Sequence, residues 1–167
     1  MSGIFGIVSK KNCASELLYG TDYHSHMGTE YGGMAVLGER FHRSIHDISK
    51  SQFKSKFYED YKEMEGNLGI GVISDRDAQP LIIGSKFGTF AVVSPGLVDN
   101  TNELAEELLE QGETFGEMSS GGVNSVELIA KLINQGKTLI DGIEGLYDRI
   151  TGSASTLLMK EDGIYAV

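Results

Sequence analysis

Ser2 directly follows the initiator methionine of this 167-residue sequence. A hydroxyl at a chain terminus can act as a nucleophile when the α-amine of its own residue takes the proton, because an α-amine titrates near ~8. This chemistry requires removal of Met1, since a retained methionine leaves Ser2 without a free α-amine. The apolar run Ile4–Val8 that follows would place Ser2 at the start of a strand. The chain start is therefore a candidate site for catalysis by a terminal hydroxyl.

Other reactive side chains give weaker signals. Cys13 follows a Lys-Lys-Asn turn with no evident base beside it, and we interpret it as a passive thiol. His42 and His46 are four residues apart and would share one face of a helix, a spacing compatible with a metal pair. No cysteine or acidic ligand pattern follows them, so surface or polar-core histidines are the simpler interpretation. We expect neither a metal nor a cofactor in this chain.

Composition restricts the class of protein. The sequence has 14 Lys and Arg against 24 Asp and Glu, a net charge of −10, which argues against nucleic acid or a membrane surface as the main partner. A single cysteine suits a reducing compartment, and no apolar run approaches the ~18 residues of a membrane span. Without repeats or a Pro/Ser linker, residues 1–167 are predicted to form one cytoplasmic domain.

Short segments rich in Val, Ile, Phe or Leu, bounded by glycine or polar residues, are predicted to be strands. They are Ile4–Ser9, Gly33–Leu37, Leu68–Ile73, Leu81–Ser85, Thr89–Ser94, Thr156–Met159 and Gly163–Val167. The Asp162-Gly163 dipeptide favours a tight hairpin between the last two strands, because Asp-Gly suits the primed turn types.

Helices are predicted where apolar residues recur at helical spacing before a stop signal. These segments are Ser15–Tyr23, Asn102–Gln111, Val123–Asn134 and Lys137–Tyr147. The charged and aromatic segment Ser51–Met64 is interpreted as an amphipathic helix or an exposed excursion. Early and late strands with paired helices between them indicate an α+β fold rather than a parallel doubly wound sheet.

The opening Met1-Ser2-Gly3-Ile4-Phe5-Gly6 resembles the Met-Cys-Gly-Ile-x-Gly start of class II glutamine amidotransferases, which are N-terminal-nucleophile hydrolases. Other segments match that family in the expected order along essentially the whole chain. They are Ser25–Glu30, Gly33–Ala35, Leu68–Gly71, Ala78–Leu81, Leu97–Asn100, Glu127–Ile133, Gly152–Ser155 and Gly163–Val167. The sequence is most similar to the N-terminal domain of amidophosphoribosyltransferases, the enzymes that start purine biosynthesis.

This resemblance implies a four-layer αββα sandwich of the N-terminal-nucleophile hydrolase type, truncated near its last strands. Family members continue into a phosphoribosyltransferase domain, so the resemblance also implies a longer parent in which that domain is the partner. The resemblance is also compatible with a homo-oligomer.

Glutamine hydrolysis in the resembled family needs a nucleophile, donors for the oxyanion, a cation for the substrate carboxylate and an anion for the substrate ammonium. The nucleophile position is Ser2, whose hydroxyl is much less nucleophilic at neutral pH than a thiol of pKa ~8.5. The arginine that binds the carboxylate falls on Ser74. Arg76, two residues later, is interpreted as an ordinary turn residue, although it could swing into the site.

The other two requirements are also unmatched. The oxyanion segment falls on Ser94, Pro95 and Gly96, where the side-chain amide is gone and Pro95 lacks an N–H, while Gly96 could still donate. The acidic residue aligns with the neutral Ser125. Because all four requirements change while the apolar and glycine positions stay, the resemblance predicts a degenerate glutaminase site.

Three functions remain open at the level of sequence. The parent could transfer an amino group to phosphoribosyl diphosphate from free ammonia, with this domain inert. The domain could instead be a non-catalytic binding or regulatory module. It could also be a Ser2-dependent amidohydrolase with a new substrate, which requires removal of Met1.

Overall fold

The computed structural model describes residues 2–26, 30–119 and 121–167. Its helices are α1 (Ala14–Asp22), α2 (Phe53–Phe57), α3 (Asp60–Glu63), α4 (Thr101–Glu110), α5 (Ser125–Asn134) and α6 (Leu139–Arg149). Its longer strands are β1 (Gly3–Val8), β2 (Tyr31–Leu37), β3 (Phe41–Asp47), β4 (Leu68–Ser74), β5 (Leu81–Ser85), β6 (Gly88–Val93), β11 (Leu157–Lys160) and β12 (Gly163–Ala166). The short strands are β7 (Gly96–Val98), β8 (Met118–Ser119), β9 (Gly122–Val123) and β10 (Gly152–Ala154). Met1 and the motif residues Met27–Thr29 lie outside the described residues.

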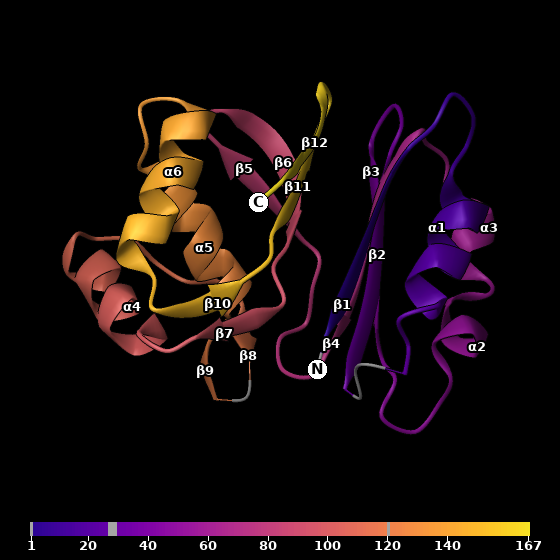
Figure 1. The fold of residues 1–167 in the computed structure, drawn as a ribbon, viewed down its shortest axis with the longest axis horizontal. Coiled ribbons are helices and arrows are strands. Elements are labelled where there is room, and N and C mark those ends of the chain that lie inside the picture. The colour runs from indigo at the N-terminus through magenta and orange to yellow at the C-terminus, as the bar shows by residue number, and fades with distance from the viewer. Residues whose placement is uncertain (1, 27–29, 120) are drawn as a thin grey trace.

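Two antiparallel four-stranded sheets stack between two layers of helices (Figure 1). The first sheet has the order β1-β4-β2-β3 and is covered on its outer face by α1, α2 and α3. The second has the order β12-β11-β6-β5 and is covered by α4, α5 and α6. This arrangement confirms the predicted αββα sandwich. None of the helices in the described part of the chain is long and apolar enough to cross a membrane.

Apolar side chains fill three layers because the central strands are buried on both faces. In β2, Met34 and Val36 pack toward α1 and α2, while Ala35 and Leu37 pack between the two sheets. The same alternation sends Phe90 and Val92 of β6 toward α4–α6, while its intervening residues face the other sheet. Strands that bury both faces read as continuous apolar runs, which explains why their positions could be predicted.

Glycines in β4 allow α1 to approach the first sheet closely. A Cβ added at Gly69 would lie 3.0 Å from the Leu17 side chain, and one added at Gly71 would overlap the Thr21 hydroxyl. The intervening Ile70 and Val72 face the second sheet instead. The alternating Leu-Gly-Ile-Gly-Val sequence therefore encodes a strand with a helix against one face and a sheet against the other.

The predicted strands and helices are present, with ends within one or two residues of the predicted ones, and β11 and β12 form the predicted hairpin. Because Lys160 pairs with Gly163, the two loop residues are Glu161 and Asp162, and Gly163 already belongs to β12. The assignment of His42 and His46 to a helix is wrong, since both lie on β3. His46 Nε2 instead lies 2.5 Å from Asp60 Oδ2 and 3.1 Å from Ser44 Oγ. Ser51–Met64 forms the two short helices α2 and α3, and β3 and β7–β10 were not predicted.

Candidate functional site

Two adjoining cavities lie at the end of the sandwich where β1 begins and β4 ends. The Ser2 cavity has a volume of about 440 Å³ and is lined by Ser2, Asp75 and residues of β7 and β10. The Ser125 cavity has a volume of about 330 Å³ and is lined by Asp77, Ser125 and residues of β7, α4 and β9. Arg76, Gly96 and Leu97 line both cavities, so the two adjoin, and we refer to them together as the cleft.

Ser2 is half-buried at the start of β1, and its Oγ accepts a hydrogen bond from the backbone N–H of Asp75 at 3.4 Å. The pairing of β1 with β4 places it there, because Gly3 is opposite Ile73 near the end of β4. The sheet register thus brings the chain start next to the turn after β4. The predicted nucleophile position lines the cleft.

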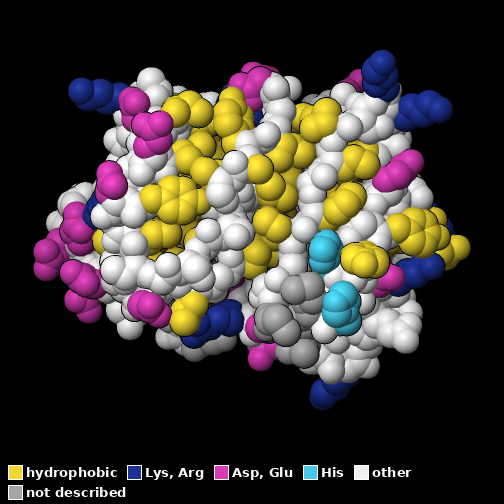
Figure 2. Space-filling view, viewed as in Figure 1, with side chains coloured by type: hydrophobic (Ala, Val, Ile, Leu, Met, Phe, Trp, Pro, Cys, Tyr) yellow, Lys and Arg dark blue, Asp and Glu magenta, His cyan; other side chains and the backbone are white. Residues whose placement is uncertain are grey.

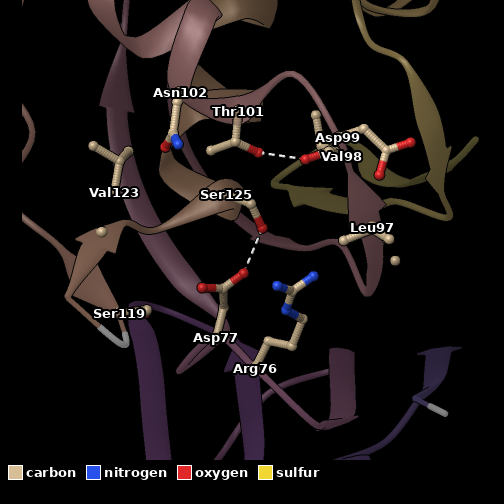
Figure 3. A pocket seen from close by; sticks show the side chains of 12 residues that line it. Arg76, Asp77, Leu97, Val98, Asp99, Thr101, Asn102, Ser119, Val123 and Ser125 are labelled. Atoms are coloured by element: carbon tan, nitrogen blue, oxygen red, sulfur yellow. Dashed lines mark hydrogen bonds between the residues drawn. The ribbon is translucent and has the colours of Figure 1, made fainter.

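Arg76 and Asp77 bring opposite charges into the Ser125 cavity (Figure 3). Both residues come from the turn after β4, and the Ser125 hydroxyl at the start of α5 donates a 2.5 Å hydrogen bond to Asp77 Oδ2. An anion beside the first turn of a helix is favoured by the helix dipole and the N-terminal N–H groups. A carboxylate therefore sits beside Ser125 although Ser125 itself is neutral.

Asp77 was not predicted as a site residue. The family resemblance placed the acidic residue on α5 itself, whereas the structure supplies a carboxylate from another element. The available signal was the adjacent Arg76-Asp77 pair in the turn between two predicted strands. Such a turn can place a carboxylate next to the helix start, where Ser125 itself is neutral.

Ser74 and Ser94 do not line the cleft, since both are buried beneath it at 3% and 4% exposure. The Ser74 hydroxyl accepts hydrogen bonds from the turn that follows it. Ser94 donates its backbone N–H to Gln79 Oε1 at 2.8 Å, and its hydroxyl lies 2.8 Å from Thr156 Oγ1. The structure therefore brings Ser2, Arg76, Gly96 and Ser125 to the cleft, whereas Ser74 and Ser94 lie beneath its surface.

In the segment that the resemblance predicts to bind an oxyanion, Gly96 has a backbone N–H that faces away from its partner strand. Asp99 donates to Thr151 and Ser155 donates to Pro95 on either side of the β7–β10 pair. Since hydrogen-bonded pairs alternate along an antiparallel ladder, the Gly96 N–H points away from β10. Its φ of +147° and the proximity of the Ser153 carbonyl both require glycine here.

Asn124 connects three of the elements around the cleft and is only 1% exposed. Its Oδ1 caps α5 by accepting the N–H groups of Val126 and Glu127, at 2.9 and 3.4 Å. Its Nδ2 donates to the Ala78 carbonyl at 3.1 Å and to Ser119 Oγ at 3.0 Å. One buried amide thus ties the turn after β4 and the β8–β9 hairpin to the helix start.

Cys13 lies away from the cleft, in the apolar layer between the first sheet and its helices. Burial raises the pKa of its thiol, with a smaller contribution from the charge of Glu16. A raised pKa lowers the thiolate fraction at neutral pH, which fits a passive thiol. Among the described residues, no group of three or more His, Cys, Asp or Glu side chains is placed to hold a metal ion.

Comparison with known proteins gives a family match for residues 66–165, to the family described as glutamine amidotransferase domain. This segment contains the turn after β4, β7 and the start of α5, but not Ser2. The fold also resembles a solved glutamine phosphoribosylpyrophosphate amidotransferase from B. subtilis, with a TM-score of 0.81 and 23% identity. That alignment covers 96% of this chain and 35% of that one.

Relatives identified by sequence have related names. An amidophosphoribosyltransferase of Methanocaldococcus jannaschii is 29% identical over all of this chain and 37% of its own length. One from a Synechocystis species is 28% identical over 99% of this chain and 35% of its own length. A glutamine–fructose-6-phosphate aminotransferase of Bartonella quintana is 27% identical over 96% of this chain and 27% of its own length. The chain thus spans between 27% and 37% of the length of these relatives.

Proposed function

This chain belongs to the glutamine amidotransferase domain family, and on that premise we propose that its cleft binds glutamine without hydrolysing it. Binding is supported by the paired charges of Arg76 and Asp77, and loss of hydrolysis by the hydroxyl at position 2. The domain is then a pseudoenzyme within an amidophosphoribosyltransferase-type protein of purine biosynthesis.

The observation that carries the loss of hydrolysis is the chemistry around Ser2. Its hydroxyl replaces a thiol, and the backbone segment beyond it offers Pro95, which has no N–H to stabilise an oxyanion. The Gly96 N–H is a single remaining donor in that segment. Removing one such donor costs about 10²–10³ in kcat in a serine protease, so a weak nucleophile and a depleted oxyanion site together reduce turnover severely.

The observation that carries binding is the pair of opposite charges in the Ser125 cavity. An α-amino acid needs a cation for its carboxylate and an anion for its ammonium, and Arg76 and Asp77 offer both in the Ser125 cavity. Arg76 also lines the Ser2 cavity, so a side-chain amide can extend from the charged end toward Ser2. Glutamine has an α-carboxylate, an α-ammonium and a side-chain amide, the three groups that this arrangement would bind.

For the parent protein we infer transfer of an amino group to phosphoribosyl diphosphate from free ammonia. The inference rests on the amidophosphoribosyltransferase relatives, of which this chain spans 37% and 35%. The partner in that case is a phosphoribosyltransferase domain of the same protein. The inference places the protein in the cytoplasm and requires no cofactor in this domain.

The test measures glutamine binding and glutamate release with the 167-residue chain, after intact mass has established whether Met1 is present. We expect calorimetric binding of L-glutamine, at least tenfold weaker in Arg76→Ala, and no glutamate above the blank. Arg40→Ala is the matched control, because Arg40 is exposed at the opposite end of the first sheet. In a longer parent, ammonia but not glutamine should support formation of phosphoribosylamine.

A Ser2-dependent amidohydrolase is the second candidate, favoured by the position of Ser2 on the cleft wall. Glutamate release by chain lacking Met1, abolished in Ser2→Ala, would establish it and overturn the loss of hydrolysis. Absence of glutamine binding would overturn the binding proposal. The hypothesis of a non-catalytic regulatory module gains support if another ligand raises the melting temperature of the chain and glutamine does not.

A further inference from the structure

Arg76 and Asp77 are adjacent in sequence, yet both side chains reach the Ser125 cavity (Figure 3). Adjacent side chains of an extended strand point to opposite faces, so the chain must bend where β4 ends to direct both charges to one place. Arg76 is exposed and Asp77 half-buried, so neither side chain belongs to the buried core of the described residues. Polar groups beneath the turn are placed to set the direction of its backbone.

Ser74 supplies those polar groups from the last position of β4. Its Oγ accepts the backbone N–H of Arg76 at 3.3 Å, the backbone N–H of Asp77 at 3.2 Å and the Gln79 side-chain amide at 3.3 Å. These three donors share the two lone pairs of one hydroxyl. Hydrogen bonds from a serine to the backbone two and three residues later are a recognised way to stabilise a turn.

Both sheets hold Ser74 and its partner in place. Ser74 pairs with Tyr31 across the first sheet, and its carbonyl accepts the N–H of Glu30 at 3.3 Å. Gln79 is 1% exposed and accepts the Ser94 N–H at the end of β6 in the second sheet. The hydroxyl thus connects the turn to a rigid position in each sheet.

We propose that Ser74 is a positioning residue, whose hydroxyl orients the backbone of Arg76 and Asp77 so that both charges face the cleft. It touches no part of the cleft itself, since it is 3% exposed and does not line either cavity. Its role is to let one turn supply both the cation and the anion for an α-amino acid. The inference rests on the proposed binding of glutamine for its ligand and on the hydrogen bonds for its structural part.

Ser94 offers a matched control for a purely structural effect. It is a serine of nearly equal burial, at 4% exposure, and its hydroxyl also makes a buried hydrogen bond, to Thr156. That hydroxyl does not contact the turn. Ser74→Ala and Ser94→Ala therefore remove the same group from similar surroundings, and only the first removes the acceptor for Arg76 and Asp77.

The experiment compares the unmodified chain, Ser74→Ala and Ser94→Ala well below their melting temperatures. Calorimetry measures affinity for L-glutamine and for 4-carbamoylbutanoate, which lacks the α-ammonium. We expect Ser74→Ala to bind glutamine about tenfold more weakly and to lose the preference for glutamine over 4-carbamoylbutanoate. Ser94→Ala should keep both the affinity for glutamine and the preference for glutamine over 4-carbamoylbutanoate. Equal losses in the two variants, or no loss in Ser74→Ala, would overturn the positioning role.

A second measurement decides the structural part without any ligand. Hydrogen exchange at the backbone amides of Arg76 and Asp77 should accelerate at least tenfold in Ser74→Ala and stay unchanged in Ser94→Ala. If the unmodified chain does not bind glutamine, the proposed function is wrong. The structural role of Ser74 is then tested by hydrogen exchange alone. Unchanged exchange at both amides in Ser74→Ala would refute the inference.

Discussion

At Gly33 the backbone of β2 touches the segment that carries the cleft charges. A Cβ at this position would overlap the Gln79 carbonyl oxygen and lie 2.6 Å from Pro80 Cδ. Gly33 is buried in the middle of the first sheet, opposite Val72 of β4. The absence of a side chain at one residue therefore sets how closely the end of the turn can pack on the sheet.

Gly33→Ala should destabilise the chain by about 1–3 kcal/mol, because the new methyl group meets backbone atoms that cannot rotate away. Gly84→Ala is the control, since Gly84 also lies in a strand and a Cβ there meets nothing within 4 Å. That variant should be neutral or more stable by about 0.4–1 kcal/mol through the unfolded state. Urea unfolding of both variants measures the difference, and equal midpoints would contradict this account of Gly33.

The charged residues of the cleft lie at positions other than those at which the resemblance led us to expect charges. Ser74 stands where the resemblance places an arginine and Ser125 where it places an acid, whereas Arg76 and Asp77 supply a cation and an anion nearby. Matching one position at a time predicted neutral residues at these positions and did not predict the nearby pair of charges. Which turn residues face a cleft depends on backbone direction, and that direction is set by hydrogen bonds such as those to Ser74.

The helices α5 and α6 both start with a side-chain cap, but the two caps differ in how many other residues they contact. Thr138 forms a capping box with Asp141 at the start of α6, where both residues are exposed. Asn124 caps α5 and also donates to Ala78 and Ser119 from a buried position. Thr138 only caps a helix, whereas Asn124 also holds the cleft together. Comparing the loss in free energy of unfolding when each cap is removed should therefore separate these two contributions.

Thr138→Ala should cost about 1 kcal/mol, the usual value for a lost N-cap, and leave glutamine affinity unchanged. Asn124→Ala should cost about 2–4 kcal/mol, since buried partners of its amide also lose their hydrogen bonds. It should also weaken glutamine binding by releasing the turn. Thermal unfolding and calorimetry on the two variants test this, and an Asn124→Ala loss no larger than that of Thr138→Ala would show that Asn124 acts only as a cap.

Element prediction from sequence succeeded where burial imposes a clear pattern. The strands β4 and β6 are apolar runs, and α5 has a continuous helical stripe with a polar cap before it. β3 was missed because Phe41–Asp47 carries His, Arg and Ser residues, as an edge strand with partial exposure can. β7 and β10 are three-residue strands that pair only through long-range contact, so no local signal marks them.

At the scale of the whole molecule, the three apolar layers stabilise a chain that carries a net charge of −10. Acidic side chains gather along the edge formed by α4 (Figure 2). There Glu107 is paired with Arg149 at 2.6 Å, whereas Glu103, Glu106 and Glu110 are exposed. Like charges at close spacing on one helix repel each other and oppose the compact state.

Added salt should therefore raise the melting temperature. The Debye length falls from about 30 Å at 0.01 M to about 10 Å at 0.1 M, so repulsion between exposed carboxylates is screened over this range. We expect a rise of a few degrees, and a smaller rise in the triple variant Glu103→Gln, Glu106→Gln, Glu110→Gln because part of the repulsion is already gone. Glu107→Gln, which breaks the pair with Arg149, should instead be less stable at low salt. A melting temperature that stays flat or falls with salt in the unmodified chain would mean that attractive pairs, and not the excess of acids, dominate its electrostatics.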